Sequence, residues 1–230
     1  MPCSLRLKSA VLKFVAHGRR VITLATGHGW RPGARYTNLR DVRHVDFAGI
    51  GFLDIDWKRY CFETHLAAAK LTRPYVTVAR DVECASKLDL ILFEASQLRK
   101  FSKNVIIVPK DRAIEDRLDT LIPPEFMLGY SVPTKYGGTA IPAEAFNRPV
   151  HLLGGRPDVQ RKLAELMPVA SFDCNRFTLD AGYGDFFDGV RFKPHPVGGY
   201  EVCLNASIAN IDALWSDYDA ATHNGQLSDG

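Results

Sequence analysis

Residues 150–173 carry the pattern that most constrains the fold: two apolar runs joined by a glycine turn and a short helical stretch. The first run stops at two glycines, a proline begins the helical stretch, and the second run stops at Asp173. Proline suits the first position of a helix because its missing N–H would be unpaired there anyway. Strands that are apolar throughout and alternate with helices predict a parallel sheet covered by helices on both faces.

The same alternation extends upstream. Apolar runs predict strands at 50–53, 75–79, 105–108, 126–130, 150–154 and 169–172. Stretches between them predict helices at 62–71, 86–101, 114–121, 142–146 and 158–166. Another short run predicts a strand at 21–25 that leads into a loop at 27–36. The C-terminal part predicts an irregular hairpin at 190–204, a helix at 207–215 and a polar, flexible tail at 216–230.

Polar residues follow the expected strands. Because carboxyl ends of parallel strands meet at one edge, we expect these residues to gather there. Carboxylates held close together repel one another unless they share a proton or meet a partner, so such a cluster indicates a site, although any single aspartate could instead cap the next helix. His151 lies inside an apolar strand and is expected to be a packed core residue. The gathered residues are Asp54, Asp56, Asp81, Lys110, Ser131, Gly154 and Asp173.

Charge is distributed unevenly along the chain, whose formal net charge is +3. Residues 1–44 hold nine basic residues and one acidic residue, a balance of +8, whereas the remainder holds 20 basic and 25 acidic residues, a balance of −5. Seven of the nine are arginines, which match phosphate oxygens bidentately. This segment predicts contact with nucleic acid through Arg19, Arg20, Arg31, Arg35 and Arg40; the alternative is a basic surface that faces only solvent.

Several classes of function lack their motifs. The five cysteines are scattered without a C-x-x-C pair, which argues against a structural zinc site and favours free thiols. The chain has no phosphate-binding glycine loop, dinucleotide fingerprint or nucleophile elbow. We therefore expect no cofactor and no metal. An apolar run of membrane-spanning length and a signal peptide are also lacking, so we expect a cytoplasmic protein with no membrane contact.

An aspartate cluster with glycine-rich walls suits chemistry at a sugar. A carboxylate can attack an anomeric carbon, and a second carboxyl group then manages the proton of the leaving group. A purine leaving group needs an acceptor for its N–H edge, which a third aspartate supplies. Glycine lets the backbone approach a flat base closely.

These residues resemble the tRNA-guanine transglycosylases and the DNA-acting relatives that insert 7-deazaguanines into DNA, such as those of phages. The resemblance covers residues 48–185 and rests on the order of four short motifs. They are GFLD at 51–54, VARDVEC at 78–84, FMLGYSVP at 126–133 and the strand–helix–strand at 151–175 that ends in Phe-Asp-Cys-Asn.

The resemblance implies a fold and a set of roles. The fold is an α/β, TIM-type (β/α)8 barrel, complete or abbreviated, that lacks the family's zinc-binding subdomain. Asp173 becomes the nucleophile and Asp54 the general acid/base, with Asp56 as its alternative. The resemblance assigns substrate binding to Asp81, Gly129, Tyr130 and Ser131. To these we add Asp56, Lys110 and Asn175, which follow the expected strands, although Lys110 stands where the family has a glutamine.

The expected organisation is a basic segment at 1–44 that is part of the barrel or packed on it, a catalytic barrel at 45–215, and the tail. The leading hypothesis is exchange of guanine in DNA for a free 7-deazaguanine base, with RNA not excluded, in the cytoplasm (the host cytoplasm for a phage-encoded copy). One alternative is a glycosylase that excises the base with water. Another is a non-catalytic nucleic-acid-binding protein on the same barrel.

Overall fold

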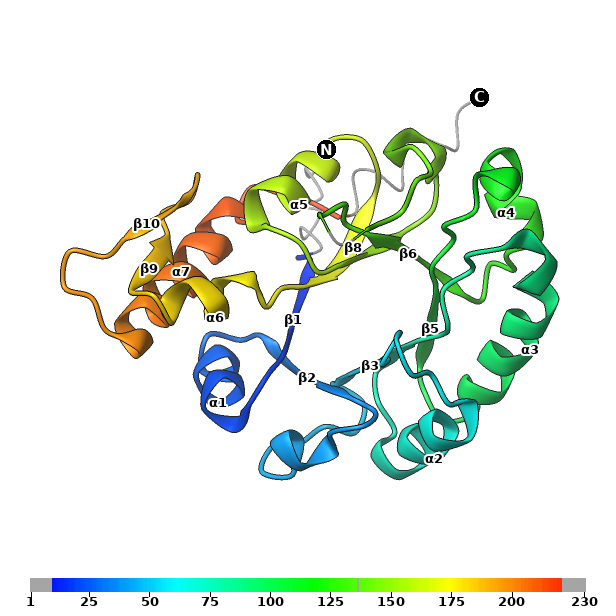
Figure 1. Ribbon diagram of the computed structural model, residues 1–230, viewed down its shortest axis with the longest axis horizontal. Helices are drawn as coiled ribbons and strands as arrows, with labels where there is room; N and C mark the ends of the chain where they lie inside the picture. Colours follow the sequence, from blue (N-terminus) through cyan, green and yellow to red (C-terminus); the bar gives the residue numbers. More distant parts are fainter. Residues whose placement is uncertain (1–9, 136, 221–230) are drawn as a thin grey trace, which may run out of the picture.

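The computed structural model describes residues 10–135 and 137–220, which fold into a closed barrel of eight parallel strands. Neighbouring strands pair in sequence order, and β1 pairs with β8 to close the barrel. Figure 1 shows the strands enclosed by an outer ring of helices. The strands are β1 (Leu12–Ala16), β2 (Arg31–Arg35), β3 (Phe52–Asp54), β4 (Val76–Val78), β5 (Asn104–Ile107), β6 (Met127–Ser131), β7 (Val150–Leu153) and β8 (Val169–Asp173).

The helical ring is abbreviated although all eight strands are present. Two connections, from β2 to β3 and from β6 to β7, contain only short 3₁₀ turns, η1 (Leu39–Val42) and η4 (Ala143–Ala145). Two further 3₁₀ turns, η2 (Ala85–Lys87) and η3 (Arg112–Arg117), precede α-helices. The α-helices are α1 (Arg19–Gly27), α2 (Phe62–Thr72), α3 (Leu88–Leu98), α4 (Leu118–Leu121), α5 (Pro157–Leu163), α6 (Arg176–Ala181) and α7 (Tyr200–Leu214).

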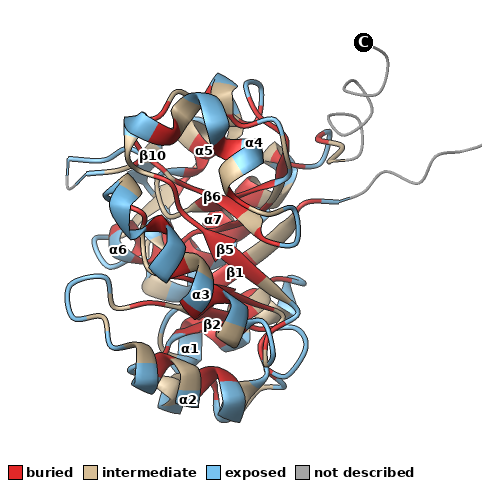
Figure 2. Ribbon diagram, turned by 90° about the vertical axis from the view of Figure 1, so that its right-hand side faces the viewer, coloured by how far each residue is buried: buried red, intermediate tan, exposed pale blue. Residues whose placement is uncertain are grey.

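The buried face of each element points toward the barrel, as the burial colouring in Figure 2 shows. Inside the barrel, the ring of His151 stacks on Phe52 with centroids 5.1 Å apart, and Phe14 packs against both rings. These three fully buried side chains fill the centre of the barrel below the carboxyl ends of the strands. The interior is therefore a packed core, and open space remains only at the mouth.

The chain after β8 completes the ring. A small hairpin of β9 (Asp185–Phe187) and β10 (Phe192–Pro194) precedes α7, which packs beside α1 and α6 (Figure 1). Asp212 on α7 accepts hydrogen bonds from Lys13 Nζ on β1 and from Trp30 Nε1 just before β2. The last helix thus ties the first two strands to the end of the chain.

Three expectations for the chain ends were wrong. Residues 21–25 belong to α1, because Val21, Ile22 and Ala25 share one buried helical face. The predicted loop at 27–36 contains β2. The hairpin ends at Pro194, and the final helix begins at Tyr200, seven residues earlier than predicted.

Part of the predicted tail contacts the barrel. Tyr218 is buried, and its hydroxyl accepts a hydrogen bond from the backbone N–H of Val169 on β8. Residues 216–220 are therefore packed on the barrel. Residues 221–230 of the predicted tail and residues 1–9 of the predicted basic segment lie outside the described residues.

Candidate active site

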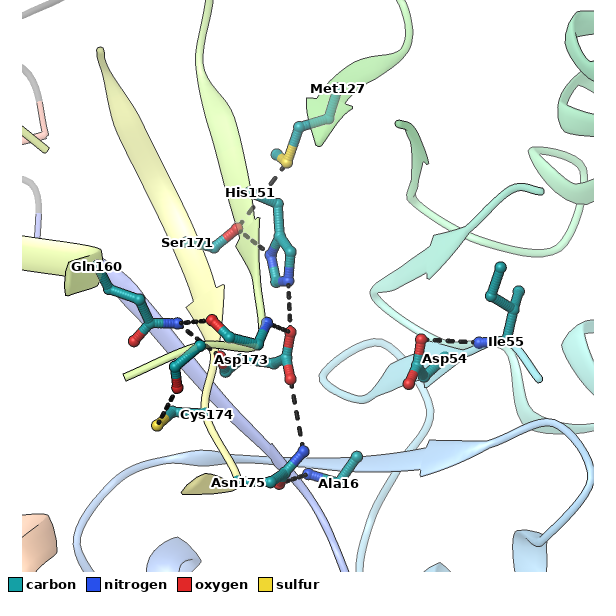
Figure 3. Close-up of polar contacts among 12 residues, drawn as sticks. Ala16, Asp54, Ile55, Met127, His151, Gln160, Ser171, Asp173, Cys174 and Asn175 are labelled. Atoms are coloured by element: carbon teal, nitrogen blue, oxygen red, sulfur yellow. Dashed lines mark hydrogen bonds and ion pairs between the residues drawn. The ribbon is translucent and has the colours of Figure 1, made fainter. Parts of the chain in front are cut away.

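A cavity of about 440 Å³ opens at the carboxyl ends of the barrel strands. This is the end at which TIM barrels assemble their sites from strand tips and the following loops. Six of the predicted substrate-site residues line it together with one of the predicted arginines: Asp54, Asp81, Lys110, Ser131, Asp173, Asn175 and Arg35. Asp54 and Asp173 come from strands on facing walls (Figure 3).

Asp173 ends β8 and is 6% exposed. Its Oδ1 accepts a hydrogen bond of 2.9 Å from the backbone N–H of Gly154 and lies 3.6 Å from His151 Nε2. Its Oδ2 has a single long contact, 3.5 Å from Asn175 Nδ2 (Figure 3). Oδ1 is therefore anchored, and Oδ2 is the oxygen free to react.

The wall around Asp173 is tied together by a buried amide. Gln160 Nε2 donates to the carbonyl oxygens of Gly154 (2.7 Å) and Asp173 (2.8 Å), which joins the loop after β7 to the tip of β8. Gly155 has a φ of +92°, and a Cβ there would lie 2.5 Å from Val132 Cγ1. Glycine is thus required where the loop passes closest to β6. This arrangement fixes the donor that holds Asp173.

His151 joins the core to the site. Its imidazole is fully buried, and Nδ1 lies 2.8 Å from Ser171 Oγ on β8. The sequence predicted a packed core residue, which is confirmed by its stacking on Phe52. Its place beside Asp173 Oδ1 was missed. The available signal was register: β7 and β8 are adjacent, and alternate residues of both strands face the barrel interior.

Asp54 ends β3 and is only partly buried. Its Oδ1 accepts one hydrogen bond, 2.8 Å from the backbone N–H of Ile55. Burial and, next, the negative charge of Asp173 raise the pKa of Asp54 to about 7, against the opposing effects of that N–H and of Arg35. Near neutral pH this carboxyl group is therefore present in both protonated and ionised forms.

A third carboxyl group in the cavity is paired with a cation. Lys110 Nζ lies 2.6 Å from Asp81 Oδ2 and 3.7 Å from Glu83 Oε1. Burial raises the pKa of Asp81, and Lys110 opposes that shift. The pair provides acceptors and a donor side by side on the β4–β5 side of the cavity, which suits the edge of a heterocyclic base.

Gly129, Tyr130 and Asp56 do not line the cavity. A Cβ on Gly129 would lie 2.5 Å from Ile106 Cγ2, so this glycine serves core packing below the mouth. Tyr130 points out of the barrel and packs edge-on against Phe146. Asp56 accepts from the backbone N–H of Lys58 and pairs with Arg59 at 3.9 Å. Of the two candidate acid/base groups, Asp54 is the one in the cavity.

Two of the predicted arginines lie at opposite ends of one strand. Arg35 lines the cavity at the carboxyl end of β2, whereas Arg31 starts that strand at the opposite end and lies 4.5 Å over the ring of Tyr75. The others lie outside the cavity lining: Arg19 and Arg20 begin α1, where Arg20 pairs with Glu201 at 2.7 Å, and Arg40 lies on η1 near Asp41. Folding thus separates residues that are close in the sequence.

Neither a metal-binding cluster nor a membrane-spanning helix occurs in the described residues. Across residues 10–135 and 137–220, no three His, Cys, Asp or Glu side chains are grouped to hold a metal ion. No helix in this part of the chain has the length and apolar character needed to cross a membrane.

Comparison with known proteins gives a family without an assigned activity. No curated protein matches the chain. Residues 25–216, which include all eight barrel strands except β1 and every residue that lines the cavity, match the model of a family of unknown function, DUF6610. The chain therefore belongs to the DUF6610 family.

Proposed function

We propose that this protein is a DNA-guanine transglycosylase, an enzyme that exchanges guanine in DNA for a free 7-deazaguanine base. One observation carries the proposal. A single cavity holds an anchored carboxylate, Asp173, and a second carboxyl group, Asp54, whose pKa is raised to about 7. Double displacement at a sugar carbon requires a carboxylate as nucleophile and a second carboxyl group that can give and take a proton near neutral pH.

In the first half-reaction, Oδ2 of Asp173 attacks C1′ of the target deoxyguanosine. The bond from C1′ to the base breaks, and its electron pair leaves with guanine, which takes a proton from Asp54. A covalent ester between Asp173 and deoxyribose remains. The protonated form of Asp54 is available for this step because its pKa is close to physiological pH.

In the second half-reaction, the incoming base gives its ring N–H proton to the now ionised Asp54. The freed nitrogen attacks C1′, and the ester bond to Asp173 breaks. Asp173 and Asp54 return to their starting protonation states. No cofactor enters either step, and atoms and charge balance over the cycle.

The neighbouring groups suit recognition of guanine-like bases. Asp81 is an acceptor for the N–H groups on the edge of the heterocycle, and Lys110, 2.6 Å away, is a donor for the ring carbonyl. Ser131 and the glycine loop after β7 line the cavity opposite. A base inside a duplex would be out of reach, so the target nucleotide must be unpaired or flipped out.

An arginine in the cavity lining supports a nucleic-acid substrate. Arg35 lines the cavity and its guanidinium suits the phosphate of the target nucleotide. Action on DNA would take place in the cytoplasm, with the host's DNA or the phage's own as substrate for a phage-encoded copy.

Incubation with DNA and radiolabelled guanine, or with 7-cyano-7-deazaguanine followed by nucleoside mass spectrometry, tests the proposal. We expect the label or the mass of the modified nucleoside to enter DNA. Abasic sites, detected by strand scission in mild alkali without added base, would instead identify a hydrolytic glycosylase. Absence of both products in the wild type would overturn the proposal.

A further inference from the structure

A second hollow of about 550 Å³ lies directly beside the candidate active site. The two share four lining residues and are therefore adjacent. The shared residues are Ile55, Trp57, Asp81 and Glu83. The second hollow follows the loops after β3 and β4.

Trp57 stands at the junction of the two hollows, three residues after Asp54. Its side chain is 59% exposed, whereas Trp30 and Trp215 are 2% and 4% exposed. Lys58 Nζ lies 5.2 Å from the centre of the Trp57 ring. An exposed indole beside a cation offers a flat surface for a base and a charge for its phosphate.

The cations of this hollow fall into two groups. Arg80 is already engaged, with Glu94 at 2.9 Å and its guanidinium 5.3 Å over the ring of Tyr60. Lys58 and Lys87, in contrast, take part in no ion pair among the described residues. Of the two acidic residues of the lining, Asp81 pairs with Lys110 at 2.6 Å, and Glu83 lies 3.7 Å from the same lysine. Two lysines therefore remain available for phosphate.

We infer that this hollow binds the nucleotide next to the target in a single-stranded stretch of DNA, with its base stacked on Trp57 and its phosphates on Lys58 and Lys87. The inference rests on the proposed function, which supplies the target nucleotide in the first cavity. A base can stack on an indole only when its own partner strand is absent, which is why the strand is single at this point. The route differs from the sequence expectation, which placed nucleic acid on the arginines of residues 1–44.

Trp57 also provides the probe. Because the other two tryptophans are buried, Trp57 is the indole that a bound base can reach. We expect oligodeoxythymidine to quench the intrinsic fluorescence of the wild type, and the same oligonucleotide to leave Trp57→Phe unquenched. Asp173→Asn should be quenched like the wild type, because stacking requires no chemistry. Oligouridine in the same titration tests whether the hollow distinguishes DNA from RNA.

Affinity, measured by anisotropy of a labelled oligonucleotide, separates the two kinds of contact. Trp57→Ala should weaken binding about tenfold through loss of base stacking. The double variant Lys58→Ala/Lys87→Ala should lower the slope of log affinity against log salt by about 1.4, because each lysine that neutralises a phosphate of single-stranded DNA adds about 0.7 to that slope. Lys70→Ala, an exposed lysine at the far end of α2, is the matched control and should change neither quantity.

Unquenched Trp57 at saturating oligonucleotide, or unchanged affinity in Trp57→Ala, would overturn the inference, as would a complete lack of binding. These outcomes are separable from failure of the proposed function. Base exchange with an unquenched Trp57 would overturn only the role of the hollow. Quenching without base exchange would overturn only the transglycosylase.

Discussion

The two walls of the cavity present the same side chain in opposite surroundings. On the β7–β8 wall, the carboxylate of Asp173 accepts hydrogen bonds from the N–H of Gly154 and, at 3.5 Å, from Asn175 Nδ2, and it lies 3.6 Å from His151 Nε2. On the β3 wall, Asp54 accepts only the N–H of its own successor, Ile55. Under the proposed function, the different surroundings of these two aspartates, rather than their residue type, assign one as nucleophile and the other as acid/base.

The two carboxyl groups also interact electrostatically across the cavity. The charge on Asp173 is one of the causes that raise the pKa of Asp54 to about 7. A wall that stabilises one carboxylate as an anion therefore favours the proton on the other. Each variant below removes one part of this asymmetry, and the expected effects decrease in size.

Removal of the nucleophile should have the largest effect. Asp173→Asn keeps the shape of the side chain and an acceptor for the N–H of Gly154, but it lacks the attacking anion. We expect base exchange to fall by about 10⁴-fold or more, measured as single-turnover incorporation of labelled guanine into DNA. Asp89→Asn, on the exposed face of α3, is the matched control. Equal activity in Asp173→Asn and the wild type would contradict the assignment.

Removal of the proton donor should cost less and change the pH profile. The wild-type rate of guanine departure should fall above pH 7, because protonated Asp54 becomes scarce as pH rises past its pKa of about 7. Asp54→Asn should lower the rate about 10²–10³-fold and abolish that decline. Single-turnover rates from pH 5.5 to 8.5 test both expectations. A decline that persists in the variant would assign it to another group.

His151 tests whether the anchored oxygen matters. His151→Phe keeps the ring on Phe52 but leaves Asp173 Oδ1 with Gly154 alone, so we expect kcat to fall about tenfold with little change in KM. His65→Phe is the control, since His65 is equally buried but faces Thr77, outside the barrel. Parallel losses of thermal stability in both variants, with equal kcat, would reduce His151 to a packing residue.

The smallest effects should come from the arginines at the two ends of β2. Arg35→Ala removes a cation from the cavity, so we expect DNA binding about threefold to tenfold weaker and a higher pKa for Asp54. Arg31→Met, at the opposite end of the same strand, should change neither. Fluorescence anisotropy with labelled DNA measures the affinities. Equal weakening by both substitutions would argue against a binding face confined to the mouth.

The strands that the sequence predicted share one property. β3 to β8 are short runs of mostly apolar residues, and burial on both faces leaves that signature directly in the sequence. Their polar end residues were predicted to gather, and Asp54, Asp81 and Asp173 do line one cavity. The alternation of strands and helices predicts parallel strands, and this was sufficient to predict that the strand-end residues gather at one edge.

The sequence predicted neither β1 nor β2, and β2 was missed for a physical reason. β2 has the sequence Arg-Pro-Gly-Ala-Arg, which contains the two residues that ordinarily argue against a strand. Gly33 is nevertheless needed, because a Cβ there would lie 3.0 Å from the Cβ of Ala16 and 3.1 Å from the ring of Phe52. In α1, a five-residue β-branched run was too short to reveal a helical period.

Contacts between residues far apart in the chain could not be predicted from the sequence. Gln160 bonds two carbonyls from separate strand ends, and Asn175 Oδ1 accepts from the backbone N–H of Ala16, 159 residues away. The separation of Arg31 from Arg35 likewise depends on the fold. Arg31 and Arg35 are four residues apart yet lie at opposite ends of a strand, which no charge count reveals.

The most direct test of the central claim needs no substrate. ¹³C NMR titration of carboxyl-labelled aspartates should show one carboxyl group with a pKa near 7, absent in Asp54→Asn. In Asp173→Asn the pKa of Asp54 should fall, because the opposing negative charge has been removed. An Asp54 that titrates near pH 4 in the wild type, or whose pKa is unchanged in Asp173→Asn, would contradict the division of roles between the two walls.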